Sequence, residues 1–386
     1  MAQIELCNIT KKFGDVIALE DISLTVHDNE FFVLFGPAGA GKTTLLKTIA
    51  GAEFPEKGLV KIGGKIVNQV EAKDRNVSMV FENYALYPNL SVYDNIASPM
   101  RSKLYKKEEE YIKTAINKVA VMMKIQYLLD RKPSQLSNGQ RQRVALGRCL
   151  VRDPNVFLMD EPLAHLDAKL RHFMRGELKE MQTSINSTTI YVTHDYMEAM
   201  SLADRIAVLN EGKIVQIGTA QEMYYTPFNE FIARIFGEPE INIIKVQRYI
   251  DDKTSEVYFK LPNQNSRLYA AKDTFEELST VNTDDIHIGI RGNDIKFAFE
   301  KQDSDWLEAT VYANEPIGNK VIMTVQLGDD KMAITCPNDT VAEMDSTVYI
   351  KFNMTNAIYF HGGTEEFITR NNLARYTLKH TKGGDK

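Results

Sequence analysis

The chain has 386 residues, of which 44% are hydrophobic and 25% are charged, and its formal net charge is −6. This composition is typical of globular proteins and excludes wholesale disorder, while the acidic balance argues against a nucleic-acid binder. The mean hydropathy is −0.29 and no run of about 18 apolar residues occurs, so we expect no membrane-spanning helix. The first residues, MAQIELCNIT, lack the features of a signal peptide. Cys7, Cys149 and Cys336 lie far apart, which suits a reducing compartment.

Residues 1–235 alternate short β-rich runs with longer helical patterns. In chain order, EFFVLFG is expected as a strand, KTTLLKTIAG as a helix, VFLMDE as a strand and HDYMEAMSLADRI as a helix. This alternation predicts a largely parallel α/β sheet.

After about Phe236 the pattern changes to short β-like runs separated by turn residues. These runs predict a small all-β barrel or sandwich. The segment GEPEINII is the expected linker, and a polar, frayed tail is expected from about Thr369. Residues 236–386 carry 17 Lys and Arg against 24 Asp and Glu, a net charge of −7, which leaves 29 against 28, or +1, in residues 1–235. The runs are EVYFKL, DIHIGIR, DIKFAF, EATVYANEP, KVIMTVQLG, KMAITC and TVYIKF.

The strongest motif is GPAGAGKT, which fits the phosphate-binding pattern G-x-x-x-x-G-K-[ST] between an expected strand and an expected helix. Glycines let backbone N–H groups surround phosphate oxygens, and the helix N-terminus favours an anion. Lys42 adds a positive charge for the β- and γ-phosphates, and the Thr43 hydroxyl is a ligand for Mg²⁺. The alternative, a glycine-rich turn with an accidental lysine, is disfavoured by the flanking strand and helix. The predicted nucleotide contacts are Gly36, Pro37, Ala38, Gly39, Ala40, Gly41, Lys42, Thr43 and Thr44.

Two carboxylates follow the apolar run 156–159. Ligands of open α/β sheets bind at the carboxyl ends of strands. Asp160 is therefore predicted to hold Mg²⁺, and Glu161 to polarise the attacking water. The alternative is a strand that ends in solvated acids, which the phosphate-binding motif disfavours.

Further motifs carry a resemblance to a known family. Leu136–Arg143, LSNGQRQR, resembles the signature LSGGQ of the ABC ATPases, and Ser137 is also a good helix N-cap. The other family elements occur in order along residues 1–235. By this resemblance, Ser137, Gly139 and Gln140 contact nucleotide, Phe13 stacks on adenine, Glu82 takes the place of the Q-loop glutamine and binds Mg²⁺, 164–167 form the D-loop, and His194 is the catalytic switch histidine.

The chain looks most similar to the ATPase subunits of maltose-type carbohydrate importers. This resemblance implies an α/β P-loop NTPase domain (an ABC ATPase) over residues 1–235, with a helical subdomain at about 84–150. A smaller all-β, OB-like domain of the TOBE type would occupy 236–386. It also implies ATP and Mg²⁺ as cofactors and ATP hydrolysis that powers import of a carbohydrate or similar polar solute.

The resemblance further implies partners. Two ATPase domains pair head to tail, so that the signature of one closes on the nucleotide of the other. Transmembrane permease subunits supply the pathway and contact residues 83–88, an extracytoplasmic protein delivers the solute, and no nucleic acid takes part. The subunit is expected at the cytoplasmic face of the membrane, bound peripherally.

Three residues depart from the family pattern. Glu82 stands where a glutamine is usual, Asn138 replaces the first glycine of the signature, and His165 lies in the D-loop. Glu82 adds a negative charge near the γ-phosphate. Asn138 can replace the glycine because asparagine tolerates a left-handed backbone conformation better than other residues with a side chain. The partner ATPase is therefore either an identical chain or a distinct homologue whose pairing makes the two sites unequal.

Two other functions stay open at this point. One is a soluble regulatory or nucleic-acid-associated ATPase, which the single P-loop and the acidic β domain disfavour. The other is a binding role of the β domain itself, for a small oxyanion or a regulatory protein.

Overall fold

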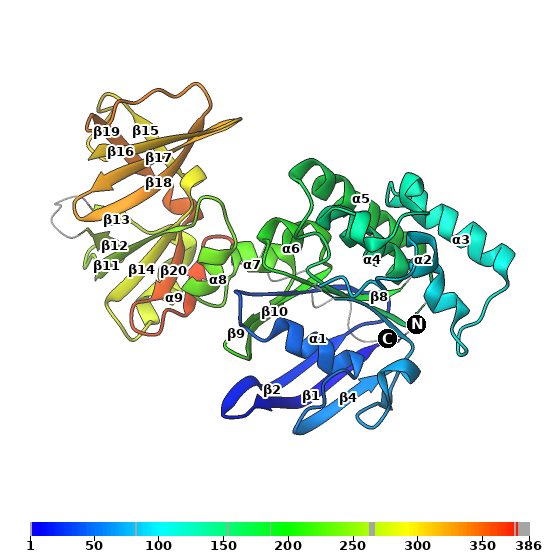
Figure 1. Ribbon diagram of the computed structural model, residues 1–386. Coiled ribbons are helices and arrows are strands. Elements are labelled where there is room, and N and C mark those ends of the chain that lie inside the picture. The colour runs from blue at the N-terminus through cyan, green and yellow to red at the C-terminus, as the bar shows by residue number, and fades with distance from the viewer. Residues whose placement is uncertain are drawn as a thin grey trace. The chain divides into compact units, whose positions relative to one another are not determined.

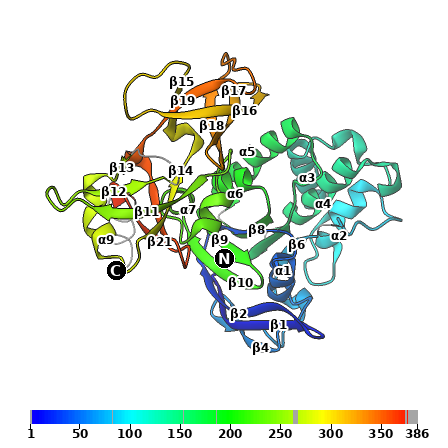
Figure 2. The same cartoon turned by 90° about the vertical axis from the view of Figure 1, so that its left-hand side faces the viewer.

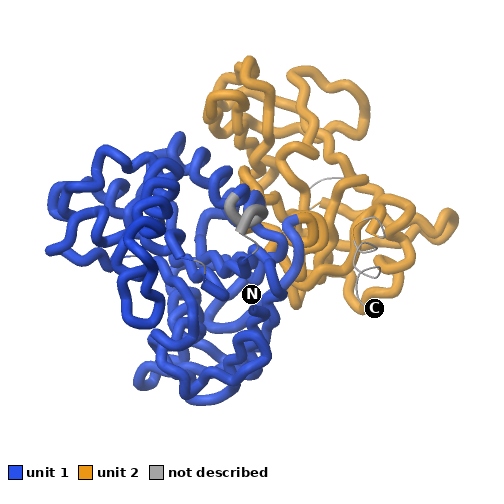
Figure 3. Tube along the Cα trace, turned by 90° about the vertical axis from the view of Figure 1, so that its right-hand side faces the viewer, with its two compact units in different colours: residues 1–220 blue, residues 221–386 orange. Residues whose placement is uncertain are grey.

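The computed structural model describes residues 2–81, 83–152, 154–185, 187–261, 267–373 and 376. The chain forms two compact units, residues 1–220 and residues 221–386 (Figure 3). None of the described helices is both long and apolar enough to cross a bilayer.

The first unit is built on a six-stranded sheet whose described strands run in the order β10-β9-β3-β8-β7-β6 (Figure 1). All of them are parallel to their neighbours except β10, which is antiparallel to β9. The central strands are buried along their whole length, as expected for apolar runs covered on both faces. The predicted parallel α/β sheet is confirmed. The strands are β3 (Phe31–Phe35), β6 (Val77–Val80), β7 (Val156–Asp160), β8 (Thr188–Thr193), β9 (Arg205–Asn210) and β10 (Lys213–Gly218).

A second, antiparallel sheet of the first unit has the order β2-β1-β4-β5. Its apolar side chains form one core with helix α1 (Lys42–Ala50) and the large sheet, including Ile4, Leu24, Leu45 and Leu158. This shared core fixes α1 against the strand that precedes it. The strands are β1 (Ile4–Phe13), β2 (Val16–Val26), β4 (Lys57–Ile62) and β5 (Lys65–Ile66).

Helices α2, α3 and α4 contact one another and lie between β6 and β7 in the sequence. Gly147 of α4 permits close packing, because a Cβ there would lie 3.0 Å from Val119 Cγ1 of α3. Ser91 begins α2 by accepting a hydrogen bond from the Asp94 N–H. The helices are α2 (Val92–Arg101), α3 (Glu109–Met122) and α4 (Asn138–Leu150), with 3-10 turns at Ala72–Asp74, Gln126–Leu128 and Pro133–Gln135.

Helix α5 (Ala168–Ile185) precedes β8, and α6 (Tyr196–Leu202) follows it. The helical pattern after His194 predicts a helix to Ile206, which is wrong, because Arg205 already begins β9. Asp204 explains this early end. Its backbone N–H donates to the Phe31 carbonyl at 2.9 Å, and its carboxylate accepts from the Phe31 N–H at 2.8 Å, so the chain is drawn into the sheet.

The second unit consists of two antiparallel sheets, with strand orders β13-β12-β11-β14-β20-β21 and β15-β19-β16-β17-β18 (Figure 2). Alternating buried and exposed residues, as in β16, place one core between them. The predicted all-β second domain is confirmed. The strands are β11 (Asn242–Ile250), β12 (Val257–Lys260), β13 (Arg267–Tyr269), β14 (Asp285–Ile290), β15 (Ile295–Ala298), β16 (Leu307–Ile317), β17 (Lys320–Leu327), β18 (Asp330–Pro337), β19 (Thr347–Phe352), β20 (Ile358–His361) and β21 (Phe367–Arg370).

Short helices accompany these sheets: α7 (Ala220–Tyr225), α8 (Glu230–Ile235) and α9 (Phe275–Thr280), with 3-10 turns at Lys272–Thr274, Gly292–Asp294 and Met354–Asn356. The predicted linker is partly wrong, because Asn242 already begins β11 and its side-chain amide bonds the backbone of Ile290 and Ala333. The tail also starts later than expected, since Thr369 is buried within β21. The predicted domain boundary at 235/236 stays a prediction, because the compact units meet at 220/221.

Candidate nucleotide site

The loop of residues 36–41 joins β3 to α1, and its glycines are required by space as well as by conformation. Gly39 and Gly41 have φ values of 79° and 103°, which disfavour any other residue. A Cβ at Gly36 would lie 2.1 Å from the Leu209 carbonyl oxygen, and one at Gly41 would lie 2.5 Å from the Ala18 carbonyl oxygen. The backbone therefore takes a path that side chains would block, with Pro37, Ala38 and Gly39 exposed and Ala40 buried.

Lys42 begins α1 and lies against this loop. Its side-chain amine donates hydrogen bonds to the carbonyls of Gly36 and Pro37, both at 2.8 Å, and the residue is 6% exposed. Thr44 is half-buried one turn before Thr48, whose hydroxyl donates to its carbonyl. A cation held inside a turn of backbone at a helix N-terminus is the arrangement that binds phosphate.

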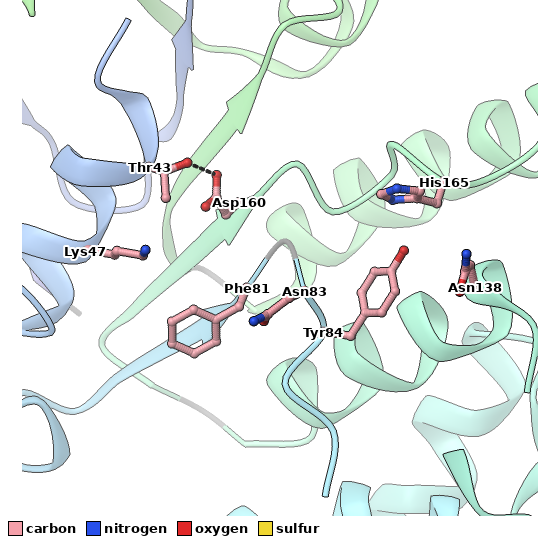
Figure 4. A pocket seen from close by; sticks show the side chains of 8 residues that line it. All are labelled: Thr43, Lys47, Phe81, Asn83, Tyr84, Asn138, Asp160 and His165. Atoms are coloured by element: carbon pink, nitrogen blue, oxygen red, sulfur yellow. Dashed lines mark hydrogen bonds between the residues drawn. The ribbon is translucent and has the colours of Figure 1, made fainter. Parts of the chain in front are cut away.

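Two oxygen donors from distant segments meet beside the loop. The Thr43 hydroxyl donates to Asp160 Oδ1 at 3.1 Å, and Asp160 is buried at the end of β7 (Figure 4). Hydroxyl and carboxylate oxygens are ligands that Mg²⁺ prefers, and this ion usually keeps water and phosphate oxygens as its other ligands. The residues fit the ion. The third predicted metal ligand, Glu82, lies outside the described residues.

A cavity of about 480 Å³ opens at this point (Figure 4). Figure 4 shows Thr43 of α1 beside Asp160, with Asn138 and His165 on the opposite side of the pocket. Its volume falls within the roughly 300–1,000 Å³ range of pockets that take small molecules and cofactors. It is lined by Thr43, Lys47, Phe81, Asn83, Tyr84, Asn138, Asp160 and His165.

The two predicted catalytic residues contact each other. His194 Nδ1 lies 3.0 Å from Glu161 Oε1, and the histidine side chain is 61% exposed, so it is open to a ligand. Glu161 adopts a left-handed conformation with φ 45°, which is strained for a side chain other than glycine. Its N–H donates to Val192 and its carbonyl accepts from Gln142, and these bonds hold the strained turn in place.

A buried group that sequence reasoning missed supports His194. Glu198 of α6 accepts hydrogen bonds from the hydroxyls of Tyr191 and Thr193, both at 2.8 Å. Burial raises the pKa of Glu198 above its usual range. The Thr193 oxygen in turn accepts from the Asp195 N–H, so the residues on both sides of His194 are fixed. Glu198 follows Asp195, the N-cap of α6, by three residues, and an acidic residue in the first turn of a helix at this spacing is the signal that could have found it.

Arg171 of α5 is a second residue that sequence reasoning missed. Its guanidinium contacts Asp195 at 3.4 Å and donates to the carbonyls of Ala164 and Leu166 in the predicted D-loop. It therefore joins the D-loop to the residue that follows His194.

The predicted signature segment begins α4 as expected. Ser137 accepts from the Gln140 N–H at 3.3 Å, and Gln140 Oε1 accepts from the Ser137 N–H at 2.9 Å. The N-cap prediction for Ser137 is confirmed. A Cβ at Gly139 would lie 3.4 Å from the His165 carbonyl oxygen, so the signature and the D-loop are in contact.

Two other predicted residues are placed as follows. The rings of His165 and Tyr84 meet edge to face, with their centroids 5.7 Å apart. Phe13 ends β1, is 47% exposed, and lies under the Lys11 ammonium, which is 4.9 Å from its ring centroid. Phe13 does not line the cavity described above, so its contact with adenine stays a prediction.

Comparison with known proteins finds relatives that share one family. The family model described as ABC transporter matches residues 19–164. The chain is 44% identical to the trehalose/maltose import ATP-binding protein MalK of Thermococcus litoralis, over 85% of this chain and 89% of that protein. It is 41% identical to the xylose/arabinose import ATP-binding protein XacJ of Haloferax volcanii, over 86% and 85% of the two chains. It is 42% identical to the sn-glycerol-3-phosphate import ATP-binding protein UgpC of Brucella abortus, over 86% of this chain and 90% of that protein.

Solved structures resemble the first part of the chain. A dimeric ATP-binding cassette in a post-hydrolysis state, bound to ADP and phosphate, is 28% identical and has a TM-score of 0.53. The match covers 56% of this chain and 98% of that chain. A second dimeric structure, of a bacterial ABC transporter cassette, is 29% identical with the same TM-score and the same coverage.

Proposed function

This chain belongs to the ABC transporter ATP-binding proteins, and from that premise we propose that it hydrolyses ATP to power import of a carbohydrate or a similar polar solute. The observation that carries the proposal is one edge of the large sheet, where Lys42, the Thr43–Asp160 pair and the Glu161–His194 pair gather. Relatives that align over most of the chain are named as import proteins for sugars and for sn-glycerol-3-phosphate, and these names support a carbohydrate or similar polar solute.

The site residues divide the chemistry among them. The loop of residues 36–41 and Lys42 bind the phosphates through N–H groups and charge. Thr43 and Asp160, with Glu82 as a further ligand, would hold Mg²⁺, which neutralises phosphate charge when bound. Glu161 accepts a proton from the attacking water, and His194 fixes its carboxylate through the bond at 3.0 Å.

The exposed start of the helical region is proposed as the permease contact. Arg148 donates to the carbonyls of Tyr84 and Ala85 and lies 5.4 Å from the Tyr87 ring centroid, so a half-buried cation braces this segment. Tyr87 remains 53% exposed on the braced backbone. An aromatic side chain on a rigid segment is a suitable anchor for a short helix of a partner.

The proposal includes the wider assembly. A partner ATPase, identical or distinct, would place its Ser137–Gly139 segment against the nucleotide of this chain. Permease subunits and an extracytoplasmic solute-binding protein would complete the importer, with this subunit at the cytoplasmic face of the membrane. Its ATPase domain would comprise residues 1–235, with the helical subdomain at about 84–150.

The test is purification of the intact complex through a tag on this chain, with Glu161→Gln as the informative variant. We expect copurified permease subunits and solute-stimulated ATP hydrolysis, which Glu161→Gln lowers at least a hundredfold while ATP binding persists. Native mass spectrometry counts the ATPase chains. A second, distinct ATPase would identify a heterodimer, and two copies of this chain a homodimer. Wild-type hydrolysis by Glu161→Gln, or a complex without hydrophobic subunits, would contradict the proposal.

A further inference from the structure

The second unit contains a pocket of about 260 Å³ that the nucleotide chemistry does not involve. Two arginines contribute to its wall, Arg291 after β14 and Arg370 at the end of β21, although they are 79 positions apart in the sequence. The volume lies just below the roughly 300–1,000 Å³ range of drug-sized pockets, which suits a small metabolite. The other lining residues are Tyr224, Tyr225, Asp294, Asn356, Ile358 and Tyr376.

Both arginines are buried although they are charged. Arg291 is 6% exposed and Arg370 is 4% exposed. Arg291 donates to the carbonyls of Ala233 and Tyr224, and Arg370 to those of Tyr225 and Asn371. Each guanidinium carries five N–H groups, so these bonds use only part of its capacity.

The pocket holds an excess of positive charge. Neither guanidinium forms an ion pair with a carboxylate within the part of the chain that the structure describes. Asp294 is the acidic side chain in the pocket wall, and its carboxylate already accepts a hydrogen bond from the Asn356 amide. Two cations and one anion leave a net charge of +1 in a site that is largely removed from water, which is costly unless a further anion offsets it.

Aromatic rings frame the two cations. The Arg291 guanidinium lies 3.8 Å from the Tyr224 ring centroid, and that of Arg370 lies 4.5 Å from the Tyr376 centroid. Tyr225 stacks on Tyr376 with centroids 4.5 Å apart. These rings orient the guanidinium groups and give the pocket flat apolar walls.

A purely structural arginine elsewhere in the chain is a useful contrast. Arg75 is also buried, but it donates to three carbonyls, those of Thr48, Ile49 and Val70. It therefore braces backbone alone, whereas Arg291 and Arg370 each donate to two carbonyls and together line one cavity.

We propose that this pocket binds a small hydroxylated oxyanion, a sugar acid or a sugar phosphate. Arg291 and Arg370 take the carboxylate or phosphate, because a guanidinium matches either group with two parallel hydrogen bonds. Asp294 and Asn356 accept and donate hydrogen bonds to hydroxyl groups, and the tyrosine rings pack against the carbon skeleton. The site is independent of the nucleotide site, so the full chain can bind this ligand whether or not ATP is present.

The experiment is isothermal titration calorimetry of the full-length protein with gluconate, glucose 6-phosphate, glucose and inorganic phosphate. Saturating MgADP is present throughout, because the loop that contains Lys42 also binds phosphate groups. We expect saturable binding of one or both hydroxylated anions at one site per chain, and no binding of glucose. Gluconate alone would identify a carboxylate group, and glucose 6-phosphate alone a phosphate group.

Three variants separate this site from an accidental cavity. Arg370→Gln should weaken anion binding about tenfold or more, since it removes a charged donor. Arg267→Gln is the matched control, because Arg267 lies in the same unit with its side chain 47% exposed and should leave affinity unchanged. Asp294→Asn should tighten binding several-fold, because it raises the excess charge of the pocket without removing the polar group.

The Asp294→Asn variant keeps the test informative even where Arg370→Gln unfolds, since a disrupted pocket does not gain affinity. Glucose or inorganic phosphate binding as tightly as the hydroxylated anions would overturn the proposal. So would an absence of anion binding, or an unchanged affinity in Asp294→Asn.

Discussion

Glu198 offers a sharp test of how the strand that carries His194 is held. Its Oε2 atom accepts both hydrogen bonds, from Tyr191 and from Thr193, at 2.8 Å each. Tyr191 is 0% exposed and Thr193 is 3% exposed, so neither hydroxyl has ready access to water. Glu198→Ala therefore leaves two buried donors without their acceptor.

The expected loss follows from these two donors. A buried hydrogen-bonding group without a partner costs about 1–3 kcal/mol, so Glu198→Ala should lower the free energy of unfolding by about 2–6 kcal/mol. In a unit of 150–250 residues, each kcal/mol shifts the melting temperature by about 2–4 °C. Glu198→Gln should stay within about 1 kcal/mol of the wild type, because one amide oxygen can accept both bonds from the position of Oε2.

The contribution of Glu198 to folding stability should depend on pH in a definite direction. Burial raises the pKa of Glu198 from its usual 4.5, so the folded state favours the protonated carboxyl. Its contribution to stability is complete below about pH 4.5 and is lost as the pH rises through the raised pKa. The melting temperature of the wild type, relative to that of Glu198→Gln, should therefore fall from pH 5 to pH 8.

Differential scanning calorimetry of the full chain measures these shifts, with Glu180→Ala as a control on an exposed glutamate of α5. The two units require their transitions to be assigned separately. A Glu198→Ala variant that melts within about 2 °C of the wild type would refute the reasoning. A Glu198→Gln variant as unstable as Glu198→Ala would show that the charge, and not the acceptor, is needed.

Three further predictions concern nucleotide capture and the domain boundary. Gly36→Ala should abolish ATP binding measured with a fluorescent analogue, because its Cβ would lie 2.1 Å from the Leu209 oxygen, whereas Gly39→Ala, with open space around its Cβ, should bind more weakly but detectably. Lys42→Ala should lose at least tenfold in MgATP affinity while it melts like the wild type, and unchanged affinity would contradict the phosphate role. Fragment 1–235 should be folded, as measured by circular dichroism, and should bind ATP in a titration. Fragment 1–220 tests whether α7 and α8 belong to that domain. An unfolded 1–235 fragment would place the boundary elsewhere.

Much of the nucleotide site was predictable because its residues sit at the ends of regular elements. Thr43 and Asp160 are 117 positions apart in the sequence. Asp160 ends strand β7, and Thr43 begins the helix after strand β3 of the same parallel sheet, and the carboxyl ends of parallel strands share an edge. The same rule brings Glu161 and His194 together at 3.0 Å. By contrast, the contact between Tyr84 and His165 joins two irregular segments, whose positions depend on tertiary packing that no local pattern encodes.

In the second unit, the local sequence pattern predicts the strands but not how they pair. Short β-like runs separated by turn residues identified its strands, because the composition of a run is a property of each segment alone. The pairing of β14 with β20, or of β15 with β19, depends on long-range partners that the composition of a run does not select. Arg291 and Arg370 follow from that pairing, since each lies where a strand ends, and they meet because β14 and β21 both flank β20. From the sequence alone, an arginine at the end of an apolar strand only interrupts the hydrophobic pattern and indicates no function. Two such charges that the topology places in one pocket are instead evidence for a ligand site.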